Sequence, residues 1–256
     1  ITGLNQITDV EIDKINKPSL VIPAGYLSKK DAIVTVVLAL IISLSLGVCS
    51  PQFGTEGLNT ALWGSAILGT MYRLPPFRLK RFPLLAAFCI VAVRGTIINA
   101  SFFAHAKAAV FGGGSSVLGC LATDPKCYWS SAFFAVFGVV IALMKDVPDV
   151  IGDAESKIRT FSVRLGQVHI FTTMRRLLSG LFWAFGAAFW RAALKPAPMQ
   201  FRICRVIAGT MSLWGGWSVR QQAQGVDAED PGQVYRYYMH LWKLFYLSYL
   251  VLPFAR

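Results

Sequence analysis

Charged residues are scarce in this chain, and acidic ones are the scarcest. Only 15% of its 256 residues are charged, with 13 Asp and Glu against 25 Lys and Arg, while 55% are hydrophobic. Such a composition excludes a water-soluble domain of ordinary make-up. It favours a protein whose solvent is the lipid bilayer.

The sequence also lacks the usual cysteine and histidine patterns. Its five cysteines form no CxxC pair and show no metal-ligand spacing with the three histidines, which argues against a zinc site or a disulfide framework. No Ser–His–Asp or Cys–His arrangement is present either, so a covalent enzyme intermediate is not expected. The net charge of +12 could suggest nucleic acid, but basic residues between apolar runs indicate membrane orientation instead.

Apolar stretches long enough to cross about 30 Å of hydrocarbon recur along the chain. The second stretch is rich in small residues, which suits close helix packing. The pattern predicts an all-α, polytopic transmembrane helical bundle with about seven crossings, at roughly 31–49, 57–72, 83–106, 128–145, 168–191, 203–220 and 237–254.

Alternate crossings place the intervening segments on alternate membrane faces. Segments 1–30, 73–82, 145–167 and 221–236 then share one face, which holds every carboxylate cluster and more of the Lys and Arg than the opposite loops. A bias of this kind predicts a cytosolic face, or a stromal one in a plastid.

The first polar motif lies near the beginning of the chain. Asn5, Asp9 and Asp13 are spaced by four residues, so they share one face of a helix. A solvated acidic helix end is the simpler explanation for such a motif taken alone.

The second motif runs from Lys145 to Asp153. Asp146, Asp149 and Asp153 fall on one face if the helix continues through Pro148. Two acidic faces on one side of a membrane protein favour a site over two solvated ends. Oxygen ligands of this type bind Mg²⁺, which completes its shell with water and substrate phosphates, so the expected ligand is a diphosphate.

Basic and polar residues accompany these acids. Arg78 and Lys80 lie in a loop on the same predicted face, where they could neutralise a leaving diphosphate. For Arg73 in that loop, a membrane anchor and a site residue are equally good interpretations, and the same holds for Arg81. Arg94 and Asn99 lie inside the third crossing, so we expect them to line a cavity, with an interhelical hydrogen bond as the alternative for the amide. The Arg175–Arg176 pair is unexpected in lipid and suggests that its helix lies partly at the interface.

These motifs resemble the UbiA superfamily of intramembrane aromatic prenyltransferases, whose hallmarks are an NxxxDxxxD motif and a later DxxDxxxD motif. The strings NQITDVEIDKINKPSLVIPAG, ALMKDVPDVIGDAESKIRTFSVRLGQ and YMHLWKLFYLSYLVLPFAR look like the homogentisate prenyltransferases of plants and algae, particularly the phytyltransferases of the tocopherol pathway. The family has nine transmembrane helices, so residues 1–256 would form a single domain with about seven of them. We expect the first helix and most of the second to precede Ile1.

The resemblance implies a role for each motif residue. Catalysis would fall to Asp9, Asp13, Asp146, Asp149 and Asp153, which with Asn5 would hold Mg²⁺. Diphosphate would be bound or the site sealed by Asn5, Lys14, Lys17, Tyr72, Arg78, Lys80 and Lys145, and Arg94 and Asn99 match a family RGxxxN pattern in the cavity wall.

The function that this implies is Mg²⁺-dependent transfer of a phytyl or geranylgeranyl group to homogentisate in a plastid membrane. Rival enzymes would use solanesyl diphosphate, or a flavonoid, chlorophyll or haem precursor as acceptor. A rival function of another class is that of a transporter or channel, because such proteins also carry charged residues within the membrane. A soluble terpene synthase shares aspartate-rich helices, but it requires amphipathic helices rather than uniformly apolar ones.

Overall fold

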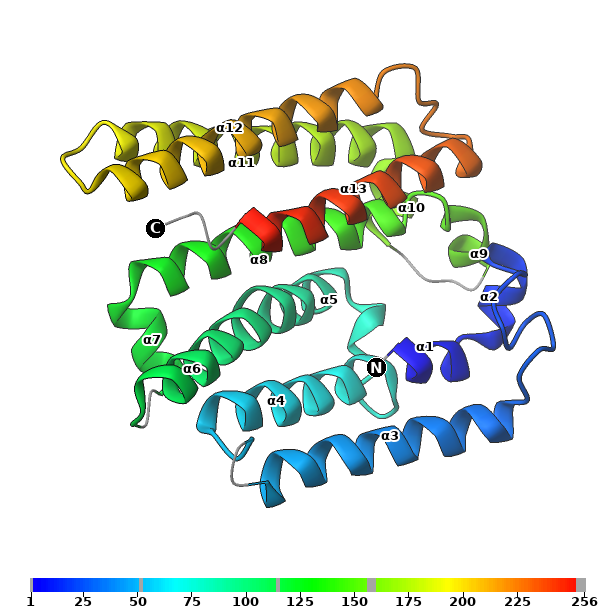
Figure 1. Ribbon diagram of the computed structural model, residues 1–256. Helices are drawn as coiled ribbons and strands as arrows, with labels where there is room; N and C mark the ends of the chain where they lie inside the picture. The colour runs from blue at the N-terminus through cyan, green and yellow to red at the C-terminus, as the bar shows by residue number, and fades with distance from the viewer. Residues whose placement is uncertain (1, 51–52, 114–115, 156–159, 252–256) are drawn as a thin grey trace. The chain divides into compact units, whose positions relative to one another are not determined.

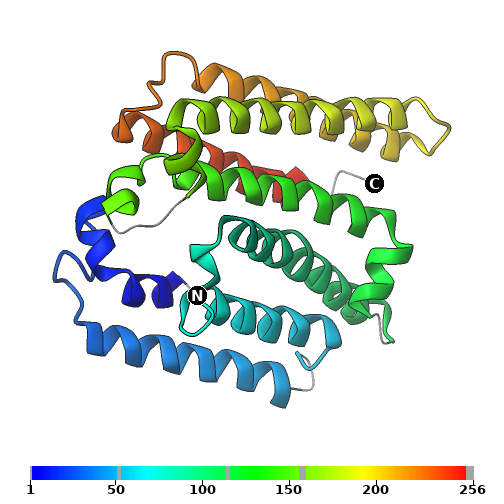
Figure 2. The ribbon, with the colours of Figure 1, turned by 180° about the vertical axis from the view of Figure 1, so that it is seen from behind.

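The computed structural model describes residues 2–50, 53–113, 116–155 and 160–251. Within these ranges every regular element is helical, and no strand occurs. The helices form two compact units, one comprising residues 1–135 with 151–160 and the other 136–150 with 161–256. The all-α prediction is confirmed (Figures 1 and 2).

The first unit contains most of the short elements. In chain order these are α1 (Thr2–Thr8), α2 (Val10–Asn16), α3 (Lys29–Cys49), α4 (Glu56–Arg73), the 3₁₀ turn η1 (Leu79–Arg81), α5 (Pro83–Ile90), the π-helical η2 (Val91–Ile97), α6 (Ile98–Phe111), α7 (Val117–Thr123), the first half of α8 (Pro125–Lys145) and most of α9 (Val150–Glu155).

Helix α3 illustrates a lipid-type surface. Its start is capped by Ser28, whose Oγ accepts a hydrogen bond from the Asp31 amide at 3.1 Å. Beyond the first turn, Ile41, Ile42 and Leu46 are all exposed. Exposed side chains of this size all along a helix are unfavourable in water and suited to hydrocarbon.

Helices α4 and α6 pack closely because small residues line their contact, as the composition of 57–72 predicts. A Cβ atom at Gly57 would lie 2.4 Å from the Ser101 carbonyl oxygen, so only glycine fits there. Just before it, Thr55 Oγ1 lies 2.7 Å from His105 Nδ1 on α6. This pair fastens the beginning of α4 to α6.

The third predicted crossing is one helical run with a π-helical segment at its centre. The amide of Ile98 donates to the carbonyl of Val93, five residues earlier, as in a π-helix. Gly95 in this segment approaches α8 closely, because an added Cβ would lie 2.3 Å from the Cβ atom of Ala135.

The second unit is built from the second half of α8, α10 (Phe161–Leu165), α11 (Gln167–Ala193), α12 (Met199–Gln222) and α13 (Pro231–Val251). Helices α11 and α12 lie side by side in both views (Figures 1 and 2), and Ser212 Oγ donates to the Phe182 carbonyl at 2.7 Å. The Phe137 ring of α8 lies 5.6 Å from Phe182 on α11 and 5.2 Å from Phe245 on α13. An aromatic core therefore joins three helices of this unit.

Each of the seven predicted crossings coincides with a long helical run, although residues 252–254 of the last one lie outside the described residues. By length and composition, three runs in the described part of the chain are apolar enough to cross a membrane: Lys29–Cys49, Leu84–Phe111 and Pro125–Lys145. For the remaining four, the crossing stays a prediction. The helix with Arg175 and Arg176 is among these four, because α11 is less uniformly apolar.

Candidate active site

The first motif does not form one unbroken helix, which corrects the prediction. Helix α1 ends at Thr8 and α2 begins at Val10, with Asp9 between them at φ −111° and ψ 18°. The Thr8 hydroxyl lies 3.1 Å from the carbonyl oxygens of both Leu4 and Asn5, so this side chain competes for backbone groups where the helix is interrupted.

The spacing by four nevertheless survives the interruption. The amide of Asp9 donates to the Asn5 carbonyl at 3.0 Å, and that of Asp13 donates to the Asp9 carbonyl at 2.8 Å. Asp9 and Asp13 are both buried. Asn5, Asp9 and Asp13 therefore lie on successive turns that remain linked by backbone hydrogen bonds.

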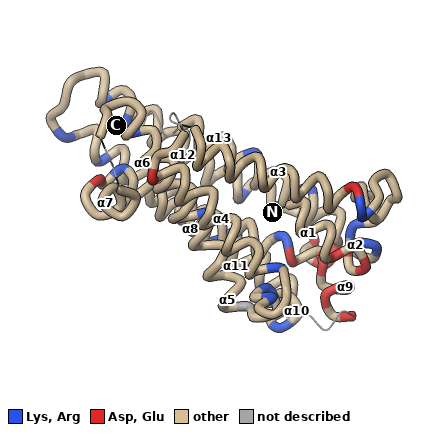
Figure 3. The backbone as a smooth tube through the Cα atoms, turned by 90° about the horizontal axis from the view of Figure 1, so that it is seen from below, with Lys and Arg blue, Asp and Glu red and all other residues tan. Residues whose placement is uncertain are grey.

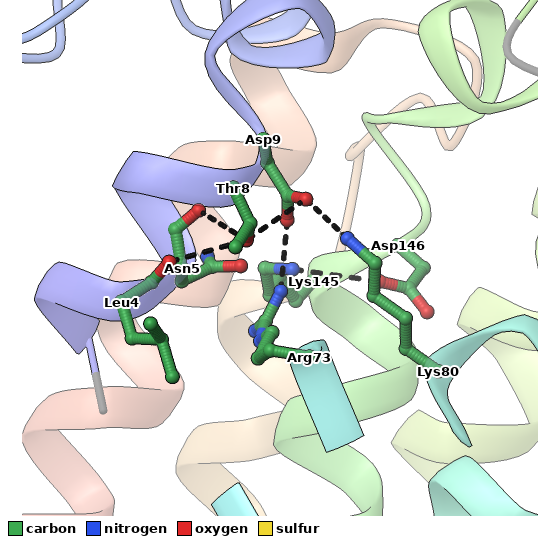
Figure 4. A network of polar contacts seen from close by, with 8 residues as sticks. All are labelled: Leu4, Asn5, Thr8, Asp9, Arg73, Lys80, Lys145 and Asp146. Atoms are coloured by element: carbon green, nitrogen blue, oxygen red, sulfur yellow. Dashed lines mark hydrogen bonds and ion pairs between the residues drawn. The ribbon is translucent and has the colours of Figure 1, made fainter. Parts of the chain in front are cut away.

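The Asp9 carboxylate binds two cations from distant parts of the first unit (Figure 4). Arg73, the last residue of α4, donates from Nη1 to Asp9 Oδ2 at 2.8 Å, and Lys80 in η1 donates from Nζ to Oδ1. The three side chains are only 10% (Asp9), 14% (Arg73) and 9% (Lys80) exposed. Ion pairs with so little water around them are strong and are only weakly screened by salt.

Charge is unbalanced in this cluster, because two cations share one carboxylate. Burial lowers the pKa of Lys80 below its ordinary value, and the neighbouring charges of Arg73 and Arg78 lower it further, while Asp9 acts in the opposite direction. The surplus of positive charge favours the binding of an anion.

Arg78 adds a third cation to this neighbourhood. Its backbone is left-handed, with φ 39° and ψ 52°, which is uncommon for a residue with a side chain. Within the described residues its half-buried guanidinium has no carboxylate partner. The structure thus places Arg78 near Lys80, and their contact with a diphosphate stays a prediction.

Arg73 was left undecided by the sequence, and the structure brings it to the site. Its guanidinium carbon lies 4.9 Å from the centre of the Tyr72 ring, a cation–π contact that orients the side chain. Its Nε is buried and has no hydrogen-bond partner within the described part of the chain. The feature of the sequence that could have identified Arg73 as a site residue is its position in the segment that also carries Arg78 and Lys80.

The two lysines of the first motif differ from this buried group. Lys14 pairs with Glu11 at 3.0 Å, and both side chains are largely exposed, a contact of the kind that contributes little to stability. Lys17 follows α2, half-buried, and its amide donates to the Asp13 carbonyl at 2.7 Å.

Oxygen atoms suited to a hard cation lie along the first motif. The Oδ1 atom of Asn5 is buried and has no hydrogen-bond donor among the described residues. Within the same residues, no three His, Cys, Asp or Glu side chains gather closely enough to hold a metal ion. A buried, unpaired amide oxygen one turn from Asp9 nevertheless fits a cation that prefers oxygen ligands.

The second motif is not a continuous helix, so the condition for its three acids to share one face, a helix that continues through Pro148, is not met. Helix α8 ends at Lys145 and α9 begins at Val150, so Asp146 and Asp149 lie in the turn between them. Pro148 explains the break, because it lacks an amide hydrogen and its ring clashes with the preceding helical turn.

Other contacts shape this turn. The Gln167 side chain donates from Nε2 to the Val147 carbonyl at 2.8 Å, and Lys145 Nζ lies 3.8 Å from Asp146 Oδ1 (Figure 4). Asp149 is buried, and so is Asp153 within α9.

Within the first unit, α9 lies beside α2 in Figures 1 and 2, so Asp153 and Asp13 belong to neighbouring helices. Figure 3 shows that acidic positions of this unit gather around α1, α2 and α9, with a smaller group at α7. Asp146 and Asp149 belong to the second unit. The convergence of all six oxygen donors stays a prediction.

The π-helical segment holds the remaining two candidates. The Asn99 side-chain amide donates to the carbonyl of Arg94 and, at 3.3 Å, to that of Gly95. The Asn99 amide thus donates to carbonyls of its own helix at the π-helical segment. Segments of π-helix often occur at functional sites. A cavity-lining role stays a prediction for both residues.

The model of the UbiA prenyltransferase family matches residues 1–244. The chain belongs to this family.

Curated relatives match over the whole chain. It is 40% identical over 258 residues to homogentisate phytyltransferase 1, chloroplastic, of Arabidopsis thaliana, and the match covers 100% of this chain and 62% of that protein. It is 36% identical to homogentisate geranylgeranyltransferase of Hordeum vulgare, covering 100% of this chain and 59% of that one. The chain thus spans about three fifths of the length of these UbiA relatives.

A solved structure has the same fold. It is described as "Structural and mechanistic insights into the biosynthesis of Digeranylgeranylglyceryl phosphate synthase in membranes", with a TM-score of 0.52 and 17% identity over 98% of this chain and 78% of that one. The likeness shows the fold of this chain, and three of its described helical runs are long and apolar enough to cross a membrane.

Proposed function

We propose that this UbiA-family chain transfers a phytyl or geranylgeranyl group from its diphosphate to homogentisate. The names of the two relatives support the acceptor and both prenyl groups. The observation that carries the proposal is the buried carboxylate of Asp9, which holds two cations from α4 and η1.

The surplus charge of this cluster explains why the ligand should be a diphosphate. Asp9 neutralises only one of the two cations that it binds, and Arg78 lies close to Lys80. An anion with several negative charges gains more from such a group than a singly charged one. As the bond between the prenyl carbon and the diphosphate oxygen breaks, negative charge grows on the leaving group, and Arg78 and Lys80 stabilise it.

The first motif fits Mg²⁺, because the unpaired oxygen of Asn5 and the buried carboxylate of Asp13 are hard ligands. A bound Mg²⁺ would supply electrostatic stabilisation of the leaving diphosphate. The residues that would hold it are Asn5, Asp9, Asp13, Asp146, Asp149 and Asp153.

The remaining candidates would bind or enclose the substrates. Lys14, Lys17, Tyr72 and Lys145 would contact phosphate or seal the site. Arg94 and Asn99 would form part of the cavity wall, and apolar helices would exclude water, so that the aromatic ring rather than water attacks the prenyl cation. No covalent enzyme intermediate is needed.

The setting that we propose is a plastid membrane, crossed several times, with the acidic motifs facing the stroma. The chloroplastic relative and the apolar helices support this location. The side of the membrane proposed for the acidic motifs follows from the alternation of crossings and from the distribution of Lys and Arg.

The test is a substrate panel with protein purified in detergent. Homogentisate is incubated with phytyl, geranylgeranyl or solanesyl diphosphate in the presence of Mg²⁺, and prenylated products are identified by mass spectrometry. We expect product from the phytyl or the geranylgeranyl donor, and the same yield from Asp227→Asn, which alters an exposed acid outside the motifs.

Product from solanesyl diphosphate alone would replace the proposed donor with that one. If homogentisate gives no product with any donor, the proposal is refuted. Flavonoid, chlorophyll and haem precursors then become the acceptors to assay.

A further inference from the structure

Asp9 has two roles that conflict. The proposed function makes it a metal ligand, yet both of its carboxylate oxygens already accept hydrogen bonds from buried cations. A divalent cation that approaches Asp9 would meet two positive charges in a site with little water, where repulsion is only weakly screened. Metal alone should therefore bind this site poorly.

We propose that Arg73 and Lys80 form an exchange pair. Without substrate they hold Asp9, and when a prenyl diphosphate enters they transfer their hydrogen bonds to its phosphate oxygens and release Asp9 to the metal that accompanies it. This inference rests on the proposed diphosphate-dependent function. It adds a positioning role for Arg73 and an order of binding, in which metal binds with diphosphate and not before it.

Arg73 has the donors that such an exchange requires. A guanidinium offers five N–H groups in a planar fork that matches phosphate oxygens, and only Nη1 is bonded to Asp9. Its Nε is buried without a hydrogen-bond partner among the described residues. The guanidinium carbon lies 4.9 Å from the centre of the Tyr72 ring. The remaining N–H groups of Arg73 can therefore donate to an anion without moving the side chain out of its place.

Lys80 is similarly placed. Its ammonium group has three donors, of which one reaches Asp9, and its short 3₁₀ turn begins directly after the left-handed Arg78. Because Arg78 has no carboxylate partner within the described residues, an arriving diphosphate would find a cation that nothing else neutralises. It could bind there first and then attract Lys80 and Arg73.

The alternative is a purely structural ion pair that ties α4 and η1 to the break between α1 and α2. The two explanations differ in sign. Removing a structural pair would weaken the binding of metal and diphosphate together. Removing one cation of an exchange pair would strengthen the binding of metal alone and weaken the binding of diphosphate.

The experiment measures two affinities of the detergent-purified protein, one for Mn²⁺ alone by electron paramagnetic resonance and one for inorganic pyrophosphate in the presence of Mn²⁺. Lys80→Gln and Arg73→Gln are compared with the wild type. The matched control is Lys30→Gln, which removes an exposed cation at the beginning of α3 in the same unit.

For each test variant we expect Mn²⁺ alone to bind about tenfold more tightly, and pyrophosphate with Mn²⁺ about tenfold more weakly, because one buried charge is lost. The control should leave both affinities unchanged. If Arg73→Gln does not fold, Arg73→Lys, which keeps the charge without the fork, should show the weaker pyrophosphate binding and little change for Mn²⁺ alone.

Failure of the inference can be told from failure of the proposed function. If the wild type binds no pyrophosphate with Mn²⁺, the proposed function fails. If it binds pyrophosphate but neither variant gains affinity for Mn²⁺ alone, the exchange pair is refuted and the ion pairs are structural.

Discussion

Replacing Asp9 with Asn tests the charge balance of the candidate site directly. The amide keeps the size and one acceptor oxygen of the carboxylate but removes its charge. Arg73 and Lys80 would then lie side by side with no anion between them, and both side chains are almost fully enclosed.

The expected loss of stability follows from this burial. Removing one partner of a buried ion pair costs about 3 to 5 kcal/mol, because the remaining charge stays without water or a counter-ion. The retained amide oxygen and rearrangement of the flexible Lys80 should reduce this to about 2 to 3 kcal/mol. In a chain of this size that corresponds to a fall in melting temperature of roughly 5 to 10 °C.

The assay is thermal unfolding in detergent, with and without inorganic pyrophosphate. We expect Asp9→Asn to melt earlier than wild type and to regain most of the difference with pyrophosphate, since the added anion replaces the lost charge. Asp227→Asn serves as the control and should melt like the wild type. A melting temperature within 1 to 2 °C of wild type, in an assay that resolves shifts of this order, would show that the two cations need no counter-ion and would refute the reasoning.

Three further predictions concern other parts of the chain. Asp149→Ala should reduce Mg²⁺-dependent release of diphosphate by at least about 100-fold, measured by a pyrophosphate assay, and release at the wild-type rate would contradict the enzyme interpretation. Hydrogen bonds from the side chain and amide of Gln233 lower the pKa of Asp230 below 3.8. The stability that Asp230 contributes is therefore present above pH 3.8 and is lost as the pH falls through the lowered pKa. Melting curves between pH 7 and 2 should show a smaller acid-induced loss of stability for Asp230→Asn, which caps the helix without titrating. Gly57→Ala should lower the melting temperature strongly, because its Cβ would lie 2.4 Å from a carbonyl oxygen of α6. Gly180→Ala, whose Cβ would have nothing within 4 Å, should stabilise the protein slightly. Equal effects of the two substitutions on the melting temperature would contradict the close packing at Gly57.

The break at the second motif could have been predicted from the sequence. Pro148 lies between Asp146 and Asp149, and a proline inside a helical pattern usually ends or kinks the helix. The three acids share one face only if the helix continues through Pro148, and the structure shows that the helix ends before it. The Lys14–Glu11 ion pair could also have been predicted from the sequence, because residues three apart on a helix are neighbours.

Local rules therefore account for what the sequence alone determined. Long apolar runs predicted the helices, and small residues predicted close packing of residues 57–72. The spacing of Asn5, Asp9 and Asp13 predicted helical turns, although not the interruption at Asp9. Each of these depends on neighbours within a few residues or on a preference for lipid over water, and such preferences can be read along the chain.

The tertiary structure alone decided which charges meet. Arg73 and Lys80 are 64 and 71 residues from Asp9, and no periodicity connects positions so far apart. The loop of residues 73–82 carries four cations, and composition cannot say which of them reaches the carboxylate. That choice depends on how α4 and η1 pack against the break at Asp9, because a buried charge must find its counter-ion where the chain brings one.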